Sequence, residues 1–321
     1  MKLSAEAGES GGVMKKALKI AGIVLLSICV CVAAVVRLMA KGSATPKDYN
    51  SKIETGGDIE AKYLQNGPYD VSFYEEPALQ NFEKYEIFYP SELESLNKRY
   101  PAIIVCNGTG WVASKSRAIY EHYASWGFIV VANEETHSWN AFGAEMAVRH
   151  LRKLNASETI NDKPNAFCRK IDFDHVGIIG HSQGGVGVIN AITNTDSKDV
   201  YKTAVSLSPT NKELAESLEW SYDATKIDVP IMLISGEGGG DDWVVTGEGL
   251  ESIYNDIGSP KVMARRLNTP HGETQYKEDG YVTAWFMWHL QGDAEASEAF
   301  IGDEPELLDN PLYQDQKINL E

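Results

Sequence analysis

The chain has 321 residues, of which 43% are hydrophobic, so it is long and apolar enough to bury the core of one large domain. Its formal net charge of −17 argues against nucleic acid as a partner, because binding phosphates depends on clustered Lys and Arg side chains. The same charge disfavours a strongly anionic substrate, since the overall field of the protein would repel it.

The first feature along the chain is an apolar stretch. Residues 20–36 carry no charge and reach the short end of what spans a bilayer as a helix. Lysines precede this run and Arg37 and Lys41 follow it, a weak bias that favours a cytoplasmic N-terminus. We therefore expect 1–16 to be cytoplasmic and 17–41 to be a transmembrane signal-anchor, with a cleaved secretory signal peptide as the alternative. In both cases the remaining chain is expected outside the cytoplasmic membrane.

The polar segment 42–62 contains proline and glycine and is expected to be a linker, so that the folded domain covers 63–321. Runs of alternating or continuous apolar residues predict strands at 69–74, 85–89, 101–106, 128–131, 176–179, 203–207, 230–234 and 261–267. Helical spacing predicts helices at 117–126, 142–154, 250–257 and 280–290, and one that follows 176–179 and ends near residue 193. This alternation predicts an α/β fold with a mostly parallel sheet covered by helices on both faces.

The stretch VGIIGHSQGGV at 176–186 contains the most informative motif. An apolar strand runs into a G-x-S-x-G pattern, and helical spacing resumes after it. Gly180 and Gly184 allow a tight turn, so that the Ser182 hydroxyl stands clear at the carboxyl end of the strand. Ser182 is therefore the candidate nucleophile. A chance match in a chain with 28 glycines is the alternative, and the strand-to-helix context argues against it.

A serine hydroxyl is a weak nucleophile and needs a histidine base that is held in place by an acid. The loop SGEGGGDDW after one strand offers Asp241 and Asp242, and the loop NTPHGE after the next offers His271. The order Ser182, acid, His271 is that of an α/β-hydrolase triad. A calcium site in the GEGGGDD loop is a weaker use of these carboxylates, and we expect neither a metal nor a cofactor.

The negative oxygen that forms when Ser182 attacks an acyl carbon requires preorganised hydrogen-bond donors. One donor is expected to be the backbone N–H of Gln183, the residue after the nucleophile. The other is expected in the loop NGTGW after the strand at 101–106, with the N–H of Thr109 preferred and that of Gly110 next.

From about residue 67 to residue 293 the sequence resembles the lidless α/β-hydrolases of the cutinase and polyester (PET) hydrolase type, which are related to dienelactone-hydrolase-like esterases. The resemblance rests on GPYDV, on NGTGW followed by SWGFIVVA, on GHSQGG, on VPIMLISGEGGGDD and on PHGE. It implies an α/β-hydrolase fold without a substantial lid domain and a serine esterase that needs no cofactor. It also implies an oxyanion donor at Thr109, and it places the triad acid at Asp241 in preference to Asp242.

Three positions depart from the family pattern. Common polyester hydrolases have an aromatic residue before the serine and Met after it, where this chain has His181 and Gln183. They also have a Tyr that clamps flat aromatic acyl groups where this chain has Thr109, which argues against aromatic polyesters unless Trp111 compensates. Gly110, Trp111 and His181 are the candidate substrate-pocket residues, and His181 is expected to shape the pocket and not to act as the base.

These features predict an exported, membrane-tethered serine carboxylesterase or lipase-like hydrolase, monomeric, that acts on a small or polymeric ester through an acyl-enzyme. The alternatives are an esterase for acetyl or feruloyl groups of polysaccharides, a serine peptidase or acyltransferase on the same fold, and a binding module that has lost the chemistry. Cys106 and Cys168 are expected to be free thiols, with a disulfide between them as the alternative.

Overall fold

A computed structural model describes residues 19, 44–79 and 82–320. The chain divides into two units, Met1–Gly42 and Ser43–Glu321, and the second unit contains the sheet and the candidate site. The segment 17–41, for which we predicted a transmembrane helix, lies outside the described residues apart from Lys19. Within the described part of the chain, no helix combines the length and the apolar character needed to cross a membrane.

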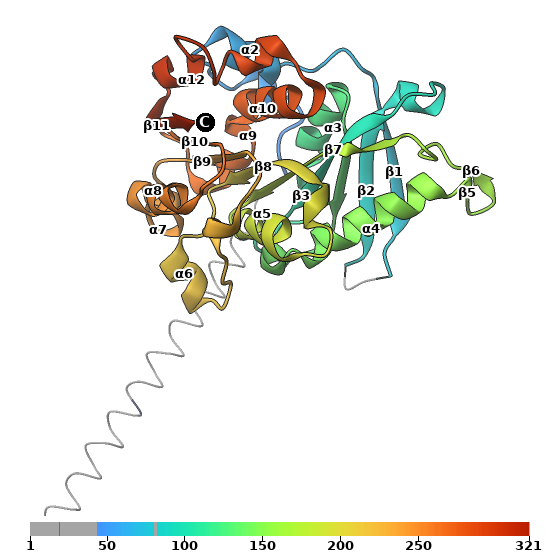
Figure 1. The fold of residues 1–321 in the computed structure, drawn as a ribbon, viewed down its shortest axis with the longest axis horizontal. Coiled ribbons are helices and arrows are strands. Elements are labelled where there is room, and N and C mark those ends of the chain that lie inside the picture. The colour runs from blue at the N-terminus through green and yellow to red at the C-terminus, as the bar shows by residue number, and fades with distance from the viewer. Residues whose placement is uncertain (1–18, 20–43, 80–81, 321) are drawn as a thin grey trace, which may run out of the picture. The chain divides into compact units, whose positions relative to one another are not determined.

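A mixed, mostly parallel sheet forms the centre of the domain (Figure 1). Its strand order among the described residues is β1-β2-β4-β3-β7-β8-β9-β10-β11. The six central strands, β4, β3, β7, β8, β9 and β10, are parallel to one another. At one side β2 pairs antiparallel with β4 and β1 with β2, and at the other side β11 pairs antiparallel with β10. The strands are β1 Val71–Pro77, β2 Lys84–Pro90, β3 Tyr100–Cys106, β4 Ile129–Asn133, β7 Ile171–His181, β8 Tyr201–Leu207, β9 Ile231–Ser235, β10 Lys261–Arg266 and β11 Tyr313–Asn319. A separate short hairpin pairs β5 (Thr159–Ile160) with β6 (Lys163–Pro164).

Helices cover both faces of this sheet, with α3 and α10 on one side and α4 and α5 on the other (Figure 1). The longer helices are α2 Asp58–Leu64, α3 Arg117–Ser125, α4 Phe142–Ala156, α5 Gln183–Asn194, α8 Gly247–Asp256 and α10 Asp279–Gln291. The shorter ones are α6 Lys212–Ser217, α7 Asp241–Val244, α9 Thr274–Lys277, α11 Ala294–Ser297 and α12 Glu306–Asp309. The expected α/β-hydrolase architecture is confirmed, and the stretch between β8 and β9 contains α6 and a single 3₁₀ turn, in keeping with the absence of a substantial lid.

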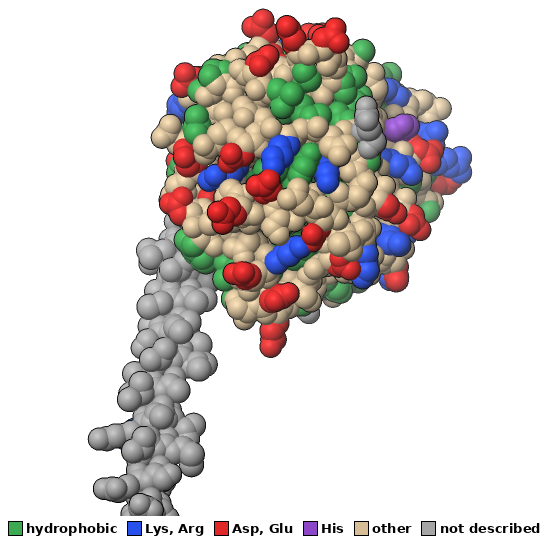
Figure 2. Space-filling view, turned by 60° about the vertical axis from the view of Figure 1, so that its left-hand side comes forward, with side chains coloured by type: hydrophobic (Ala, Val, Ile, Leu, Met, Phe, Trp, Pro, Cys, Tyr) green, Lys and Arg blue, Asp and Glu red, His purple; other side chains and the backbone are tan. Residues whose placement is uncertain are grey.

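Acidic and basic side chains lie together on one face of the domain. On the face shown in Figure 2, Asp and Glu side chains are interspersed with Lys and Arg and do not gather into one field. Several of these charges are paired, for example Lys62 with Glu295 at 2.6 Å. Such exposed pairs contribute little to stability.

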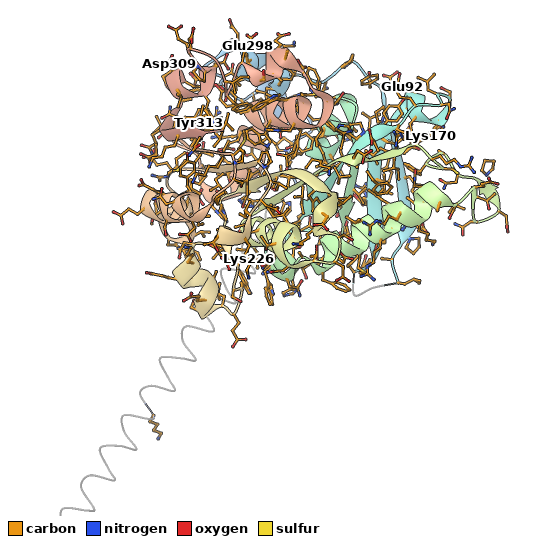
Figure 3. All side chains as sticks on the ribbon, viewed as in Figure 1. Glu92, Lys170, Lys226, Glu298, Asp309 and Tyr313 are labelled. Carbon is orange, nitrogen blue, oxygen red and sulfur yellow. The ribbon has the colours of Figure 1, made fainter. Side chains whose placement is uncertain are left out.

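Helix α2 and strand β11 are among the elements that lie where the sequence indicated no regular structure. Helix α2 falls partly in the segment 42–62 that we expected to be a linker, and it packs against α10 with Tyr63 and Leu64 buried. Strand β11 lies in the C-terminal tail and pairs with β10, with Tyr313 buried at its start (Figure 3). Part of the segment that we expected to be a linker therefore packs on the domain, whereas β11 lies within the expected bounds 63–321.

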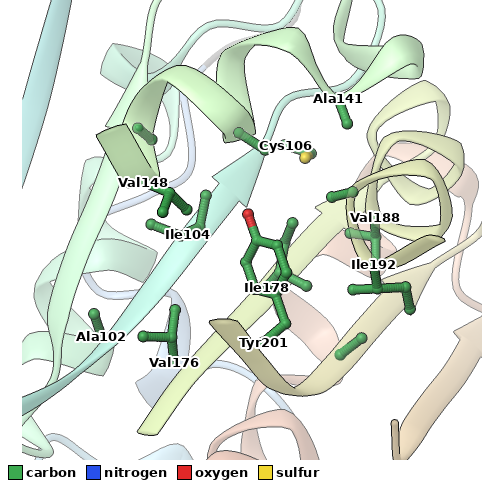
Figure 4. Packing of buried hydrophobic residues seen from close by; sticks show 14 of the residues in the cluster. Ala102, Ile104, Cys106, Ala141, Val148, Val176, Ile178, Val188, Ile192 and Tyr201 are labelled. Carbon is green, nitrogen blue, oxygen red and sulfur yellow. The ribbon is translucent and has the colours of Figure 1, made fainter. Parts of the chain in front are cut away.

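The core consists of two layers, one on each face of the sheet. Figure 4 shows part of one layer, in which Ile104 and Ile178 of the sheet pack near Val148 of α4 and Ile192 of α5. These positions recur every two residues along strands and every three or four along helices, which places them on one face of each element. Cys106 is buried in this layer, and it and Cys168 are free thiols, as expected.

Candidate active site

The candidate nucleophile lies on a strained turn between β7 and α5. Ser182 has φ of 60° and ψ of −120°, a conformation that is costly for a residue with a side chain. The turn is tight because glycines allow close backbone approach: a Cβ at Gly180 would lie 2.3 Å from the carbonyl oxygen of Gly184. A Cβ at Gly184 would lie 2.2 Å from the carbonyl oxygen of Cys106. The spacing of the G-x-S-x-G motif thus has a direct steric cause.

Three predicted residues from separate loops form one hydrogen-bonded chain. The Nε2 atom of His271 lies 2.8 Å from Oγ of Ser182, and its Nδ1 atom lies 2.5 Å from Oδ1 of Asp241. Ser182 follows β7, Asp241 begins α7 after β9, and His271 follows β10. Because these parallel strands end at the same edge of the sheet, residues that are far apart in sequence meet there.

Asp241, and not Asp242, is the carboxylate that contacts the histidine. Its second oxygen, Oδ2, accepts hydrogen bonds from Oγ of Ser208 at 2.8 Å and from the N–H of Gly236 at 2.7 Å. Burial on its own raises the pKa of Asp241, but these bonds and His271 outweigh burial and hold that pKa below its ordinary value. Asp242 is exposed and accepts from the N–H of Gly238 at 3.1 Å.

The two proposed oxyanion donors belong to different segments, Gln183 to the start of α5 and Thr109 to the loop after β3. Gln183 is the first residue of α5, where backbone N–H groups lack partners within the helix. The competing choice in the other loop, the N–H of Gly110, donates to the carbonyl oxygen of Thr136 at 3.3 Å. No described hydrogen bond uses the N–H of Thr109. This difference favours Thr109 over Gly110 as the second donor.

A set of hydrogen bonds that the sequence did not reveal connects these loops to the segment 133–138. Nδ2 of Asn107 donates to the carbonyl oxygens of Asn133 at 2.7 Å and of Glu135 at 2.8 Å. Oε1 of Gln183 accepts from the backbone N–H of Ser138 at 2.8 Å. Both side chains are almost completely buried. The segment 133–138, which we call the bracket, therefore fixes the oxyanion loop relative to the nucleophile.

No metal centre accompanies this arrangement in the described part of the chain. Within residues 44–79 and 82–320, no three His, Cys, Asp or Glu side chains gather as potential ligands of one ion. The hydrogen-bonded residues Ser182, His271 and Asp241 can supply nucleophilic and acid–base chemistry, in the manner of a Ser-His-Asp triad.

Comparison with known proteins supports the assignment from motifs. The model of a family described as PET hydrolase-like matches residues 50–300. This chain belongs to that family. Its curated relatives include Cutinase est2 of Thermobifida alba, 28% identical over 181 residues that cover 54% of this chain and 52% of the relative. Cutinase cut1 of Thermobifida fusca is 27% identical over 185 residues, which cover 55% and 54% of the two chains. The chain thus spans about half the length of the curated relatives it matches.

His181 is one of the positions at which this member of the PET hydrolase-like family departs from the pattern we described. Its Nε2 lies 2.7 Å from the carbonyl oxygen of His271, and the two rings lie 4.5 Å apart between centroids. Burial of the ring, reinforced by neighbouring His271, lowers the pKa of His181 to about 3. The ring is therefore neutral at physiological pH. Its Nε2–H donates to the backbone carbonyl oxygen of His271 and so helps to hold the loop that carries this histidine.

Trp111 is held at the edge of the oxyanion loop in this PET hydrolase-like protein. Its Nε1–H donates to Oγ of Ser116 at 2.7 Å, and the ammonium of Lys115 lies 4.7 Å from its ring centroid. The ring is only partly exposed and belongs to the wall of a cavity close to Ser182. Of the three pocket candidates, His181 and Trp111 line that cavity, whereas Gly110 does not.

Proposed function

We propose that this protein is a serine hydrolase of carboxylic esters that works through an acyl-enzyme. The observation that carries the proposal is the continuous chain of hydrogen bonds from Asp241 through His271 to Ser182. Membership of the PET hydrolase-like family and relatives named as cutinases support ester bonds as the target. The strained turn at Ser182 supports the same role, because strain of this kind persists mainly at functional sites.

In the proposed reaction, Oγ of Ser182 attacks the acyl carbon while Nε2 of His271 accepts the serine proton. The carbonyl electrons move onto oxygen, where the N–H groups of Thr109 and Gln183 donate hydrogen bonds to the negative charge. The bond to the alcohol breaks, and His271 returns its proton to the leaving oxygen. A water molecule then attacks the acyl-enzyme by the same route and releases the carboxylic acid. Asp241 keeps the histidine in the required tautomer throughout.

The decisive experiment compares two serine variants. Ser182→Ala should abolish hydrolysis of p-nitrophenyl acetate and labelling by a fluorophosphonate probe, while its melting temperature stays close to that of the wild type. Ser217→Ala is the matched control, because Ser217 is exposed on α6 and bonds only to its own helix. Retained activity in Ser182→Ala would refute the assignment. An amide matched to the ester tests the peptidase alternative, and slower cleavage of the amide supports esterase function.

We further propose that the domain works outside the cytoplasmic membrane. This placement rests on the uncharged run at 20–36 with flanking basic residues. Full-length protein should sediment with membranes, and a variant lacking 1–43 should be soluble with the same esterase activity. Recovery of the intact, uncleaved chain in the soluble fraction would contradict the anchor. A shortened chain in the medium would instead indicate a cleaved signal peptide.

A further inference from the structure

A small cavity lies behind the proposed oxyanion loop, on the α3 side of the sheet. Its volume is about 40 Å³. Most of its wall is apolar and comes from the strand ends and from α3, namely Val105, Ile119, Tyr120, Tyr123, Ile179 and Leu207. None of these side chains has a part in the triad. The proposed mechanism therefore assigns no role to this cavity.

The wall nearest the triad is formed by the two residues that flank the nucleophile in space. Gly108 and His181 both line the cavity. A Cβ placed on Gly108 would lie 3.7 Å from Cβ of Ser182 and 3.3 Å from the carbonyl oxygen of His181. Gly108 is also the neighbour of Thr109, the proposed oxyanion donor. Ser182 itself does not line the cavity, and Gly108 and His181 place the cavity next to the turn that carries the nucleophile.

We infer that this cavity receives the hydrocarbon end of the acyl group. It would therefore limit the substrates to esters of short acyl groups, above all acetyl and propionyl. The inference rests on the proposed esterase function. A cavity of about 150 Å³ holds a benzene ring, and the volume of about 40 Å³ found here is far too small for one. It accommodates one or two carbons beyond the carbonyl. Burying those carbons against an apolar wall is favourable, whereas the remainder of a longer or aromatic acyl group would have to lie outside the cavity.

A line of hydrogen bonds across one side of the cavity keeps it in shape. Trp111 donates to Oγ of Ser116 at 2.7 Å, and that hydroxyl donates to Oε1 of Gln275 at 3.4 Å. Nε2 of Gln275 in turn donates to the carbonyl oxygen of Gly272, the residue after the catalytic histidine, at 2.9 Å. All three side chains of this line border the cavity. The cavity is therefore preformed, and its wall is connected to the loops of both Thr109 and His271.

Ile119 allows the volume to be changed without touching the triad. It lies on α3, is buried, and lines the cavity. The measured quantity is the ratio of kcat/KM for p-nitrophenyl butyrate to that for p-nitrophenyl acetate. Ile119→Ala enlarges the cavity and should raise this ratio about tenfold, and Ile119→Phe should lower it about tenfold. Ile253→Ala is the matched control, because Ile253 is a buried residue of α8 that does not line the cavity, so the same change there should leave the ratio unchanged.

The outcomes separate this inference from the proposed function. If wild type and variants hydrolyse esters in a Ser182-dependent way but share one butyrate-to-acetate ratio, the cavity does not bind the acyl group and the inference is wrong. If the wild type shows no Ser182-dependent hydrolysis of either ester, the proposed function itself fails. Should Ile119→Ala not fold, Ile119→Val removes a single methyl group and should shift the ratio in the same direction by a smaller factor.

Discussion

Asp241 and Asp242 are neighbours in the sequence, yet only one of them reaches the histidine. Asp241 is fully buried with Nδ1 of His271 at 2.5 Å, whereas Asp242 is exposed. Asp241→Asn should lower kcat by about 10⁴-fold, because the amide favours the wrong histidine tautomer. Asp242→Asn should stay close to the wild-type rate. Steady-state kinetics on p-nitrophenyl acetate check both variants, and a larger loss in Asp242→Asn would reverse the assignment.

Glu135, in the bracket, makes the free energy of unfolding depend on pH. One carboxylate oxygen accepts from the N–H of Gly143 at 3.1 Å, but burial dominates and raises the pKa of Glu135 to about 7. A raised carboxyl pKa means that the folded state holds the proton more tightly than the unfolded chain does. The free energy of unfolding therefore falls as pH rises from about 4.5 to about 7, by ~3 kcal/mol from this group alone.

Glu135→Gln should remove that contribution, since the amide is neutral throughout and its oxygen can still accept a hydrogen bond. Urea unfolding at pH 5 and pH 8 measures the difference between the variant and the wild type. Glu134→Gln is the control, because Glu134 bonds to the exposed Ser114 and should retain the wild-type dependence. Equal pH dependence in Glu135→Gln and the wild type would show that Glu135 is ionised in the folded protein.

At the scale of elements, the bracket 133–138 determines how accurately the oxyanion donors are placed. Asn107→Ala removes both side-chain bonds to the bracket and lets the loop that carries Thr109 shift. We expect kcat to fall by about 10–100-fold with little change in KM, less than the 10²–10³ for losing a donor outright. Asn194→Ala, exposed on α5, is the control. A fall in melting temperature with unchanged kcat would assign Asn107 a purely structural role.

The elements around the site were predictable because their signals are local. Periodicity and glycine spacing predict the strand at 176–179, the turn at Ser182 and the loops that carry Asp241 and His271. In the structure that strand is longer and covers Ile171–His181. The bracket was not predictable, since the partners of Asn107 and Gln183 are backbone groups whose positions only the fold determines. The same holds for Ser208, whose hydroxyl contacts Asp241 across two loops.

Helix α2 and strand β11 escaped prediction for a related reason. Both are short, β11 is mostly polar, and the stability of both comes from partners that are distant in sequence. The carboxylate of Glu60 on α2 accepts hydrogen bonds from Arg266 at 2.6 Å, Asn310 at 2.8 Å and Tyr313 at 2.9 Å. No pattern within residues 58–64 indicates those contacts. From the sequence alone, Glu60 would be taken for a surface residue, because the partners that bury it are distant in sequence.

At the scale of the whole molecule, this Glu60 network joins the beginning and the end of the described domain. Glu60 and Arg266 are almost completely buried, so removing the carboxylate leaves an unpaired buried cation. Glu60→Ala should therefore lower the free energy of unfolding by about 3–5 kcal/mol. Glu295→Ala breaks only the exposed pair with Lys62 and should have a small effect. Urea denaturation checks both, and equal losses would mean that the network contributes no more than a surface pair.

The same network has a consequence for how the chain reaches its native state. Glu60 bonds to Arg266, 206 residues later, and to Asn310 and Tyr313, 250 and 253 residues later. Helix α2 cannot acquire these partners until almost all of the chain has been synthesised. Contacts between residues so far apart in the sequence slow folding. Until the C-terminal part of the chain has been synthesised, helix α2 of the nascent chain lacks these partners. We expect nascent chains that stop before residue 300 to be cut by protease near 58–64, where the complete domain resists cleavage.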